Sequence, residues 1–221
     1  MIGIVIPACN EEHYLQDCLN AIQNAVEALP DTKTKVQVLV VLDSCNDRSL
    51  EIVQHAGVDY LECNFHCVGK VRDLGVRHMI RLGVTWIACT DADSCVDSQW
   101  LLQQLNHQPA DAICGVVEVD SWKKFSALTR KNYLAHYQDT MDHSHVHGAN
   151  LSFSAISYIQ SGGFEALSSH EDVQLIKRMI DMDFNVIWSN LVRVKTSSRL
   201  HGRAPEGFAN FLYQLEHNSE V

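Results

Sequence analysis

The chain has 221 residues, of which 46% are apolar and 20% are charged, and its formal net charge is −10. This length and composition suit a globular protein of one domain, or of two small ones. The negative charge argues against a nucleic-acid partner, because polyphosphates are bound by basic surfaces.

The eight cysteines do not form the paired CxxC spacing of a structural zinc site. Cys89 and Cys114 fall inside apolar runs and are expected to be reduced core residues, which favours a cytoplasmic protein. The sequence starts directly in an apolar run with no basic segment before it, so no signal peptide is expected. No apolar run approaches the roughly 20 residues that cross a bilayer, so no transmembrane segment is expected.

The first half of the chain alternates between apolar runs and helical spacing of apolar residues. Strands are predicted at 2–6, 36–42, 60–61, 85–89 and 112–119, and helices at 10–29, 49–56, 69–82 and around 100–105. This alternation predicts an α/β fold with a mostly parallel sheet flanked by helices.

The second half is less regular. Helices are predicted at 125–141, after 170 and at 208–215, strands at 186–188 and 192–194, and a polar loop at 198–203. We find no internal repeat and no clear linker.

An acidic pair, Asp91 and Asp93, directly follows the apolar run at 85–89. Ligands of open α/β sheets bind beyond the carboxyl ends of the strands. Carboxylate oxygens suit Mg2+ or Mn2+ and leave coordination positions for phosphate oxygens. The pair therefore predicts a metal–diphosphate site, although Asp also commonly forms turns after strands.

Acidic residues recur at other strand ends and helix starts. They occur at Glu11–Glu12, at Asp43 and at Glu171–Asp172. Each could be a helix cap or a solvated charge. Because the carboxyl ends of parallel strands share one edge, we expect them to form one site with Asp91 and Asp93.

These motifs, in this order, resemble family 2 glycosyltransferases, which have the GT-A fold. The matching segments are IVIPACNEE (4–12), VVLDS (40–44), GKVR (69–72), TDAD (90–93), GANLS (148–152) and HEDV (170–173). The resemblance implies a single GT-A-like, Rossmann-like domain over 1–221. Residues 1–120 would be its nucleotide-binding half and 121–221 its less regular acceptor-binding half.

The resemblance also implies roles for individual residues. Those implied to bind the nucleotide are Pro7, Asn10, Glu12, Asp43, Lys70, Arg72 and Asp91. Asp93, with Asp91, would hold a divalent cation, and Asp172, beside Glu171, would be the catalytic base. Two positions depart from the family pattern. Ser44 and Cys45 replace the usual acid and glycine, and Asp73 stands where Asn is frequent.

The residue types fit a metal-dependent transfer of sugar from a nucleotide-sugar donor (UDP-, GDP- or dTDP-linked) to an acceptor hydroxyl. A cation bound by Asp93 would neutralise charge on the diphosphate leaving group. Asp172 would take the proton of the attacking hydroxyl. One base without an enzyme nucleophile predicts single displacement with inversion.

The C-terminal half offers further candidates. His201 could complete the metal shell from a lid formed with Arg199 and Arg203, or this segment could be an ordinary solvated loop. His147 and Asn150 are candidate acceptor-site residues. His143, His145 and His147 alternate, so they could instead bind a separate transition metal.

Two other functions stay open at this stage. One is a non-catalytic nucleotide-sugar-binding module, which would have no use for a base at Asp172. The other is a sugar-phosphate nucleotidylyltransferase, which normally has a Gly- and Arg-rich first loop where this chain has Pro7–Asn10.

Overall fold

The computed structural model describes residues 1–30, 34–200 and 207–217. Its strands are β1 (Ile2–Ala8), β2 (Val36–Asp43), β3 (Asp59–Cys63), β4 (Trp86–Cys89), β5 (Ser94–Val96), β6 (Ala112–Val119), β7 (Leu151–Ser154) and β8 (Val186–Thr196). Its α-helices are α1 (Leu15–Glu27), α2 (Ser49–His55), α3 (Val68–Arg81), α4 (Trp100–Asn106), α5 (Ala127–His136), α6 (Ala155–Gln160), α7 (Glu171–Asp181) and α8 (Phe208–His217).

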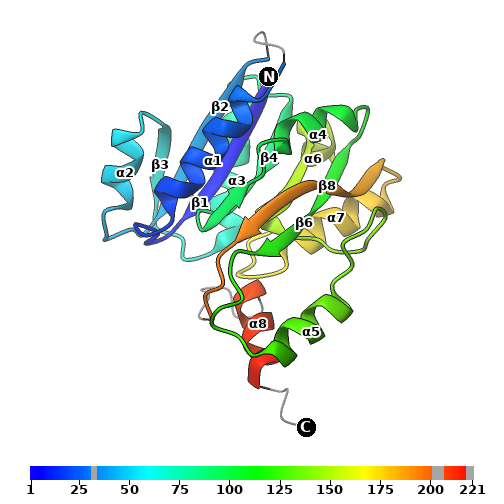
Figure 1. Ribbon diagram of the computed structural model, residues 1–221. Helices are drawn as coiled ribbons and strands as arrows, with labels where there is room; N and C mark the ends of the chain where they lie inside the picture. The colour runs from blue at the N-terminus through cyan, green and yellow to red at the C-terminus, as the bar shows by residue number, and fades with distance from the viewer. Residues whose placement is uncertain (31–33, 201–206, 218–221) are drawn as a thin grey trace.

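The strands form one mixed, mostly parallel sheet in the order β3-β2-β1-β4-β7-β6-β8-β5 (Figure 1). Strand β1 pairs in parallel with β2 and β4, and β2 pairs in parallel with β3. The α/β sheet flanked by helices that the alternation predicted is therefore confirmed.

Two strands were not expected from the sequence. Strand β7 lies antiparallel between β4 and β6, and β5 lies antiparallel to β8. Both have only three or four residues, too few to show a periodic pattern. In addition, the runs at 186–188 and 192–194 belong to one strand, β8, whose pairing with β6 shifts register between Gly115 and Val116.

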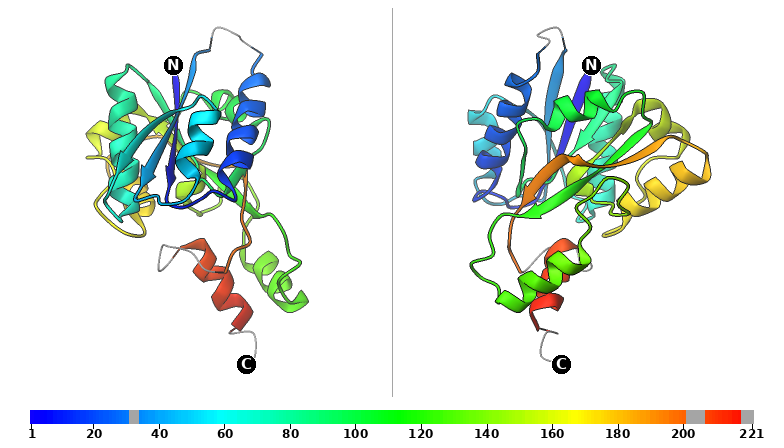
Figure 2. Two further views of the ribbon diagram at one scale, coloured as in Figure 1. Left: turned by 90° about the vertical axis from the view of Figure 1, so that its left-hand side faces the viewer. Right: turned by 45° about the vertical axis from the view of Figure 1, so that its right-hand side comes forward.

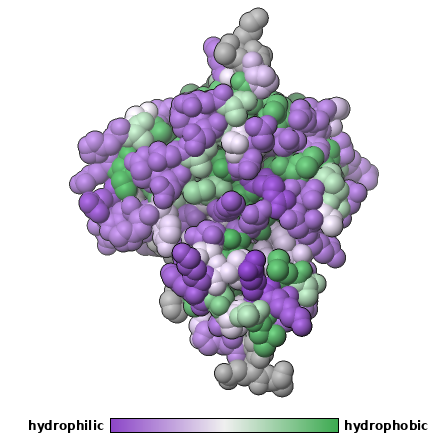
Figure 3. All heavy atoms as spheres, viewed as in Figure 1, coloured by the Kyte–Doolittle hydropathy of each residue, from purple (hydrophilic) through white to green (hydrophobic). Residues whose placement is uncertain are grey.

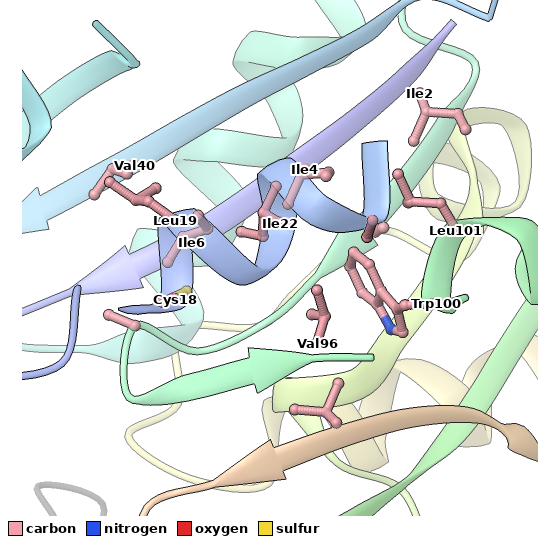
Figure 4. Close-up of a cluster of buried hydrophobic side chains, with 14 of the residues drawn as sticks. Ile2, Ile4, Ile6, Cys18, Leu19, Ile22, Val40, Val96, Trp100 and Leu101 are labelled. Atoms are coloured by element: carbon pink, nitrogen blue, oxygen red, sulfur yellow. The ribbon is translucent and has the colours of Figure 1, made fainter. Parts of the chain in front are cut away.

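Helices cover both faces of the sheet, which explains the uninterrupted apolar runs. Along β1, Ile2, Ile4 and Ile6 pack into one hydrophobic cluster, whereas Val5 packs into the other, as the alternation of strand side chains requires. Figure 4 shows side chains of α1 and Trp100 of α4 over the first face.

Helices α5 and α8 pack together and project from the sheet as a small lobe (Figures 1 and 2). A third cluster holds this lobe together, with Tyr133 and Leu212 buried at its centre. Since β7 of the second half lies between β4 and β6 of the first, the two halves share one sheet. The assignment of nucleotide and acceptor binding to these halves stays a prediction.

Within the described ranges, none of the helices has the length and apolar character needed to cross a bilayer. The eight cysteines are all free, and Cys89 and Cys114 are buried in the core as expected.

Candidate active site

A pocket of about 670 Å3 lies where β1, β2 and β4 end and α7 begins. Its acidic lining residues are Glu11, Asp43, Asp91, Asp93, Glu171 and Asp172. The acids that the sequence placed at separate strand ends and at one helix start thus share a single pocket. Parallel strands bring their carboxyl ends to one edge, which is why residues so distant in the chain converge.

The turn after β1 brings Glu11 to this pocket. Glu11 is buried, and its backbone N–H donates to Ser49 Oγ at 2.9 Å. The carboxylate of Glu12, in contrast, accepts a hydrogen bond from Arg48 Nε at 3.0 Å and is not among the pocket residues. Asn10 has a φ of 54° and its side-chain oxygen accepts from Asn46 N–H. Of the predicted residues in this turn, the structure brings only Pro7 to the pocket.

Asp43 ends β2 and lies buried in the pocket wall. Its Oδ1 accepts a hydrogen bond from the Phe65 N–H at 2.7 Å. Burial, together with the negative charge of Asp43, raises the pKa of the neighbouring Cys63 thiol to about 12. Asp43 is therefore held by the backbone that follows β3, and the adjacent thiol stays protonated.

Arg72 connects two of the acids. It is buried on the inner side of α3, with Nη2 2.5 Å from Asp91 Oδ1 and Nη1 paired with Glu171. Gly148 leaves the necessary room, because a Cβ there would lie 2.4 Å from Arg72 Nη1. This ion-pair network explains a cation in the opening turns of α3, where the helix dipole alone would disfavour one.

Lys70 points elsewhere. Its side chain is exposed, with Nζ 6.0 Å from the centre of the Phe65 ring, and it lines a separate small hollow with Asp73 and Arg77. The structure therefore does not place Lys70 in the main pocket. Asp73 accepts hydrogen bonds from Arg77 Nε and from the Tyr158 hydroxyl, so its carboxylate has a structural role here.

The side chain of Asp93 is only 8% exposed and is held by residues that follow β8. Ser197 Oγ donates to its Oδ2 at 2.6 Å, and Arg199 Nη2 lies 3.0 Å from the same oxygen. Arg199 Nη1 also lies 3.0 Å from both carboxylate oxygens of Glu11. Burial raises the pKa of Asp93, and the charge of Asp91 adds to this, against the opposing effects of Arg199 and Ser197.

Asp172 lies in the first turn of α7, after His170, which has a left-handed backbone with a φ of 63°. Its Oδ2 accepts from the Gly148 N–H at 2.5 Å, and its Oδ1 accepts from the Val173 N–H at 2.8 Å. Glu171, in contrast, is neutralised by Arg72. Asp172, unlike Glu171, forms no ion pair with another described residue. Its carboxylate is therefore not neutralised and can accept a proton.

The opposite wall of the pocket is formed in part by His147, Phe208 and Phe211. Withdrawal from water and the neighbouring His145 and His143 lower the pKa of His147 to about 3, so its ring is neutral. The three imidazoles stack with ring centres 5.4 Å and 5.8 Å apart. No group of three or more His, Cys, Asp or Glu side chains in the described residues is arranged to hold a metal, and this applies to the three histidines and to the pocket acids alike.

Asn150 is not at the pocket surface. It is buried, its amide donates to the carbonyls of Val116 and Val192 at 2.7 and 2.9 Å, and its oxygen accepts from Trp100 Nε1 at 2.8 Å. Two of these hydrogen bonds reach β6 and β8 beside their register shift, and the third reaches α4. The acceptor-site role of Asn150 stays a prediction. His201 and Arg203 lie outside the described residues.

The donor chemistry of the pocket fits a divalent cation. Asp91 and Asp93 offer hard oxygen ligands, and the six carboxylates outnumber the two guanidinium groups of Arg72 and Arg199. A diphosphate could enter so negative a pocket only with an additional cation. The protein itself would supply few ligands, which leaves positions for phosphate oxygens and water.

The fold and this acidic pocket define an α/β protein of the GT-A type. A model of glycosyl transferase family 2 matches residues 3–162, and the chain belongs to that family. A comparison with curated proteins finds no significant match.

Solved structures with the same fold have low sequence identity to this chain. S. aureus TarS 1-349 in complex with UDP-GlcNAc is 15% identical with a TM-score of 0.68, over 99% of this chain and 66% of that one. The mannosyltransferase PcManGT from Pyrobaculum calidifontis in complex with GDP-Man and Mn2+ is 16% identical with a TM-score of 0.65, over 91% and 58%. GalNAc-T7 with UDP, GalNAc and Mn2+ is 11% identical with a TM-score of 0.67, over 91% and 44%. This chain thus spans less than two thirds of each of these proteins.

Proposed function

We propose that the protein transfers a sugar from a nucleotide-sugar donor to an acceptor hydroxyl, with inversion and with the help of Mn2+ or Mg2+. The observation that carries this proposal is the shared pocket of Asp91, Asp93 and Asp172. The complexes of the similar structures with UDP-GlcNAc and with GDP-Man and Mn2+ support it.

The strand-end wall of the pocket would bind the donor. Asp43, at the end of β2, would contact the nucleoside, and Asp93 with Asp91 would hold the cation. The bound cation would neutralise charge on the diphosphate as it leaves. Arg199 now neutralises Glu11 and Asp93, so it would have to release Asp93 when the cation enters.

Asp172 would act as the general base. The Gly148 and Val173 N–H groups fix its two oxygens, which aims the carboxylate at one place in the pocket. It would take the proton of the acceptor hydroxyl as that oxygen bonds to the anomeric carbon and the bond to the diphosphate breaks on the opposite face. A single displacement of this kind inverts the anomeric configuration.

Free cysteines, three of them buried, favour a reducing, cytoplasmic compartment.

The test is an incubation with UDP-, GDP- and dTDP-sugars, with and without Mn2+, after a thermal-shift screen has found which donor stabilises the protein. We expect release of the nucleoside diphosphate, with water as the acceptor if no better one is present. Donor-induced stabilisation without any release would instead identify a nucleotide-sugar-binding module. If neither occurs with any donor, the proposal is wrong.

A further inference from the structure

Helix α5 has apolar residues on two sides, but the described structure covers only one of them. The inner side packs Tyr133, which is 4% exposed, against Tyr137 and Phe208, with ring centres 5.0 and 6.2 Å away. On the outer side, Leu128 is 47% exposed and Leu134 is 62% exposed. At 3.6 residues per turn, these two leucines flank Lys131 on the side opposite Tyr133.

Basic residues lie around these leucines. Lys131 lies between them, Arg130 lies toward the flank of the helix, and Lys123 and Lys124 precede the helix. All four are exposed, and residues 121–138 contain no Asp or Glu. The nearest acid from the packed helix α8 is Glu216, whose carboxylate accepts from the Ser126 N–H. No ion pair joins any of the four cations to an acid of the described residues. The chain as a whole has a net charge of −10, so this segment is positively charged within an acidic protein.

We infer that this α5 surface, formed by Lys123, Lys124, Leu128, Arg130, Lys131 and Leu134, docks on an anionic lipid bilayer. A basic helix with exposed leucines matches both parts of such a bilayer, because the leucines enter the acyl boundary and the cations meet the lipid phosphates. A nucleic acid or an acidic peptide would satisfy the cations but would leave the leucines in water.

The position of the lobe suits this docking. Helices α5 and α8 project from the sheet, and the lobe shows hydrophobic residues beside hydrophilic ones on the face seen in Figure 3 (Figures 1 and 3). Phe208 and Phe211 of the same lobe line the pocket. Docking through α5 would therefore hold the pocket beside the bilayer. The inference depends on this surface alone, so it stands or falls separately from the transferase proposal.

The experiment is co-sedimentation of the full chain with vesicles of phosphatidylcholine, with or without phosphatidylglycerol. One variant removes charge (Arg130→Gln with Lys131→Gln), and another removes apolar side chains (Leu128→Ser with Leu134→Ser). Matched controls change exposed residues of other helices. They are Arg81→Gln with Lys177→Gln, and Ile156→Ser with Ile159→Ser. Thermal unfolding checks that every variant is folded.

We expect the protein to bind vesicles that contain phosphatidylglycerol, with binding that weakens as salt is added. Loss of each cation should weaken this binding by about fivefold, and loss of both leucines by about tenfold or more. The control variants should bind like the unchanged protein. The inference is overturned if the protein does not bind anionic vesicles, or if the control variants lose as much vesicle binding as the α5 variants. It is also overturned if the leucine variant binds as well as the unchanged protein. Thermal stabilisation by a nucleotide-sugar, measured without vesicles, reports separately on the proposed function.

Discussion

The two walls of the pocket are built in different ways. The wall formed by the strand ends and the start of α7 carries the carboxylates, which are held by backbone N–H groups, a hydroxyl and a guanidinium. The opposite wall includes His147, Phe208 and Phe211, and the lobe behind it is held together by aromatic packing. The first wall is therefore charged and the second is neutral. Under the proposed function, the first would bind the donor through a cation and the second would face the acceptor.

The largest expected effect tests the chemical role of the charged wall. Asp172→Asn keeps the size of the side chain but removes the proton acceptor, so we expect release of nucleoside diphosphate to fall by roughly 10²- to 10⁴-fold. Donor-induced thermal stabilisation should persist in this variant. Near-normal turnover by the folded variant would remove Asp172 from the mechanism.

The second prediction concerns the stability of that wall. Arg72→Met would leave Glu171 and Asp91 without their shared buried partner, and we expect a loss of about 3–5 kcal/mol in the free energy of unfolding. Denaturant unfolding measures it. Lys70→Met, two residues away but exposed, is the matched control and should change stability little. Equal effects of the two substitutions would contradict the ion-pair network.

A third prediction separates stability from ligand binding. Burial raises the pKa of Asp93, so its ionisation costs the folded protein more than the unfolded chain. This cost develops as the pH rises from the ordinary pKa of Asp to the raised one, and it is complete above the raised value. Asp93→Asn should therefore raise the free energy of unfolding of the metal-free protein at neutral pH. The same variant should lose Mn2+-dependent stabilisation by the donor. A variant that is destabilised and still responds to Mn2+ would contradict both parts.

The smallest effect belongs to the opposite wall. His147 is neutral when folded because its pKa is lowered to about 3, whereas in the unfolded chain it gains a proton near its ordinary pKa. Its contribution to stability is therefore complete above the unfolded value and is lost as the pH falls toward the folded one. The unchanged protein should lose about 2 kcal/mol of unfolding free energy between neutral pH and pH 5 through His147, and His147→Gln should remove this loss. Identical pH profiles for the two proteins would refute this assignment.

The sequence predicted the charged wall better than the neutral one. Asp43, Asp91 and Asp93 follow apolar runs that form β2 and β4, and a parallel sheet places residues after such strands at one edge. The choice between Glu11 and Glu12 depended on which way one turn faces, which the sequence does not record. Lys70 and Arg72 lie on one helix, but only the direction of each side chain decides which enters the pocket.

Long-range contacts were the other part that the sequence could not supply. Arg199 reaches Glu11 across 188 positions of the chain, and the antiparallel β7 enters the sheet between strands that precede it. Short strands and single ion pairs leave no periodic signal.

The most direct test of the account is a calorimetric titration of the preferred nucleoside diphosphate into the protein, with Mn2+ and with a chelator. If carboxylates from distant segments surround one cation and one diphosphate, the nucleoside diphosphate should bind tightly with Mn2+ and weakly with the chelator. The Asp93→Ala variant should lose this difference in affinity. Equal affinity with Mn2+ and with chelator, or a difference that Asp93→Ala retains, would contradict it.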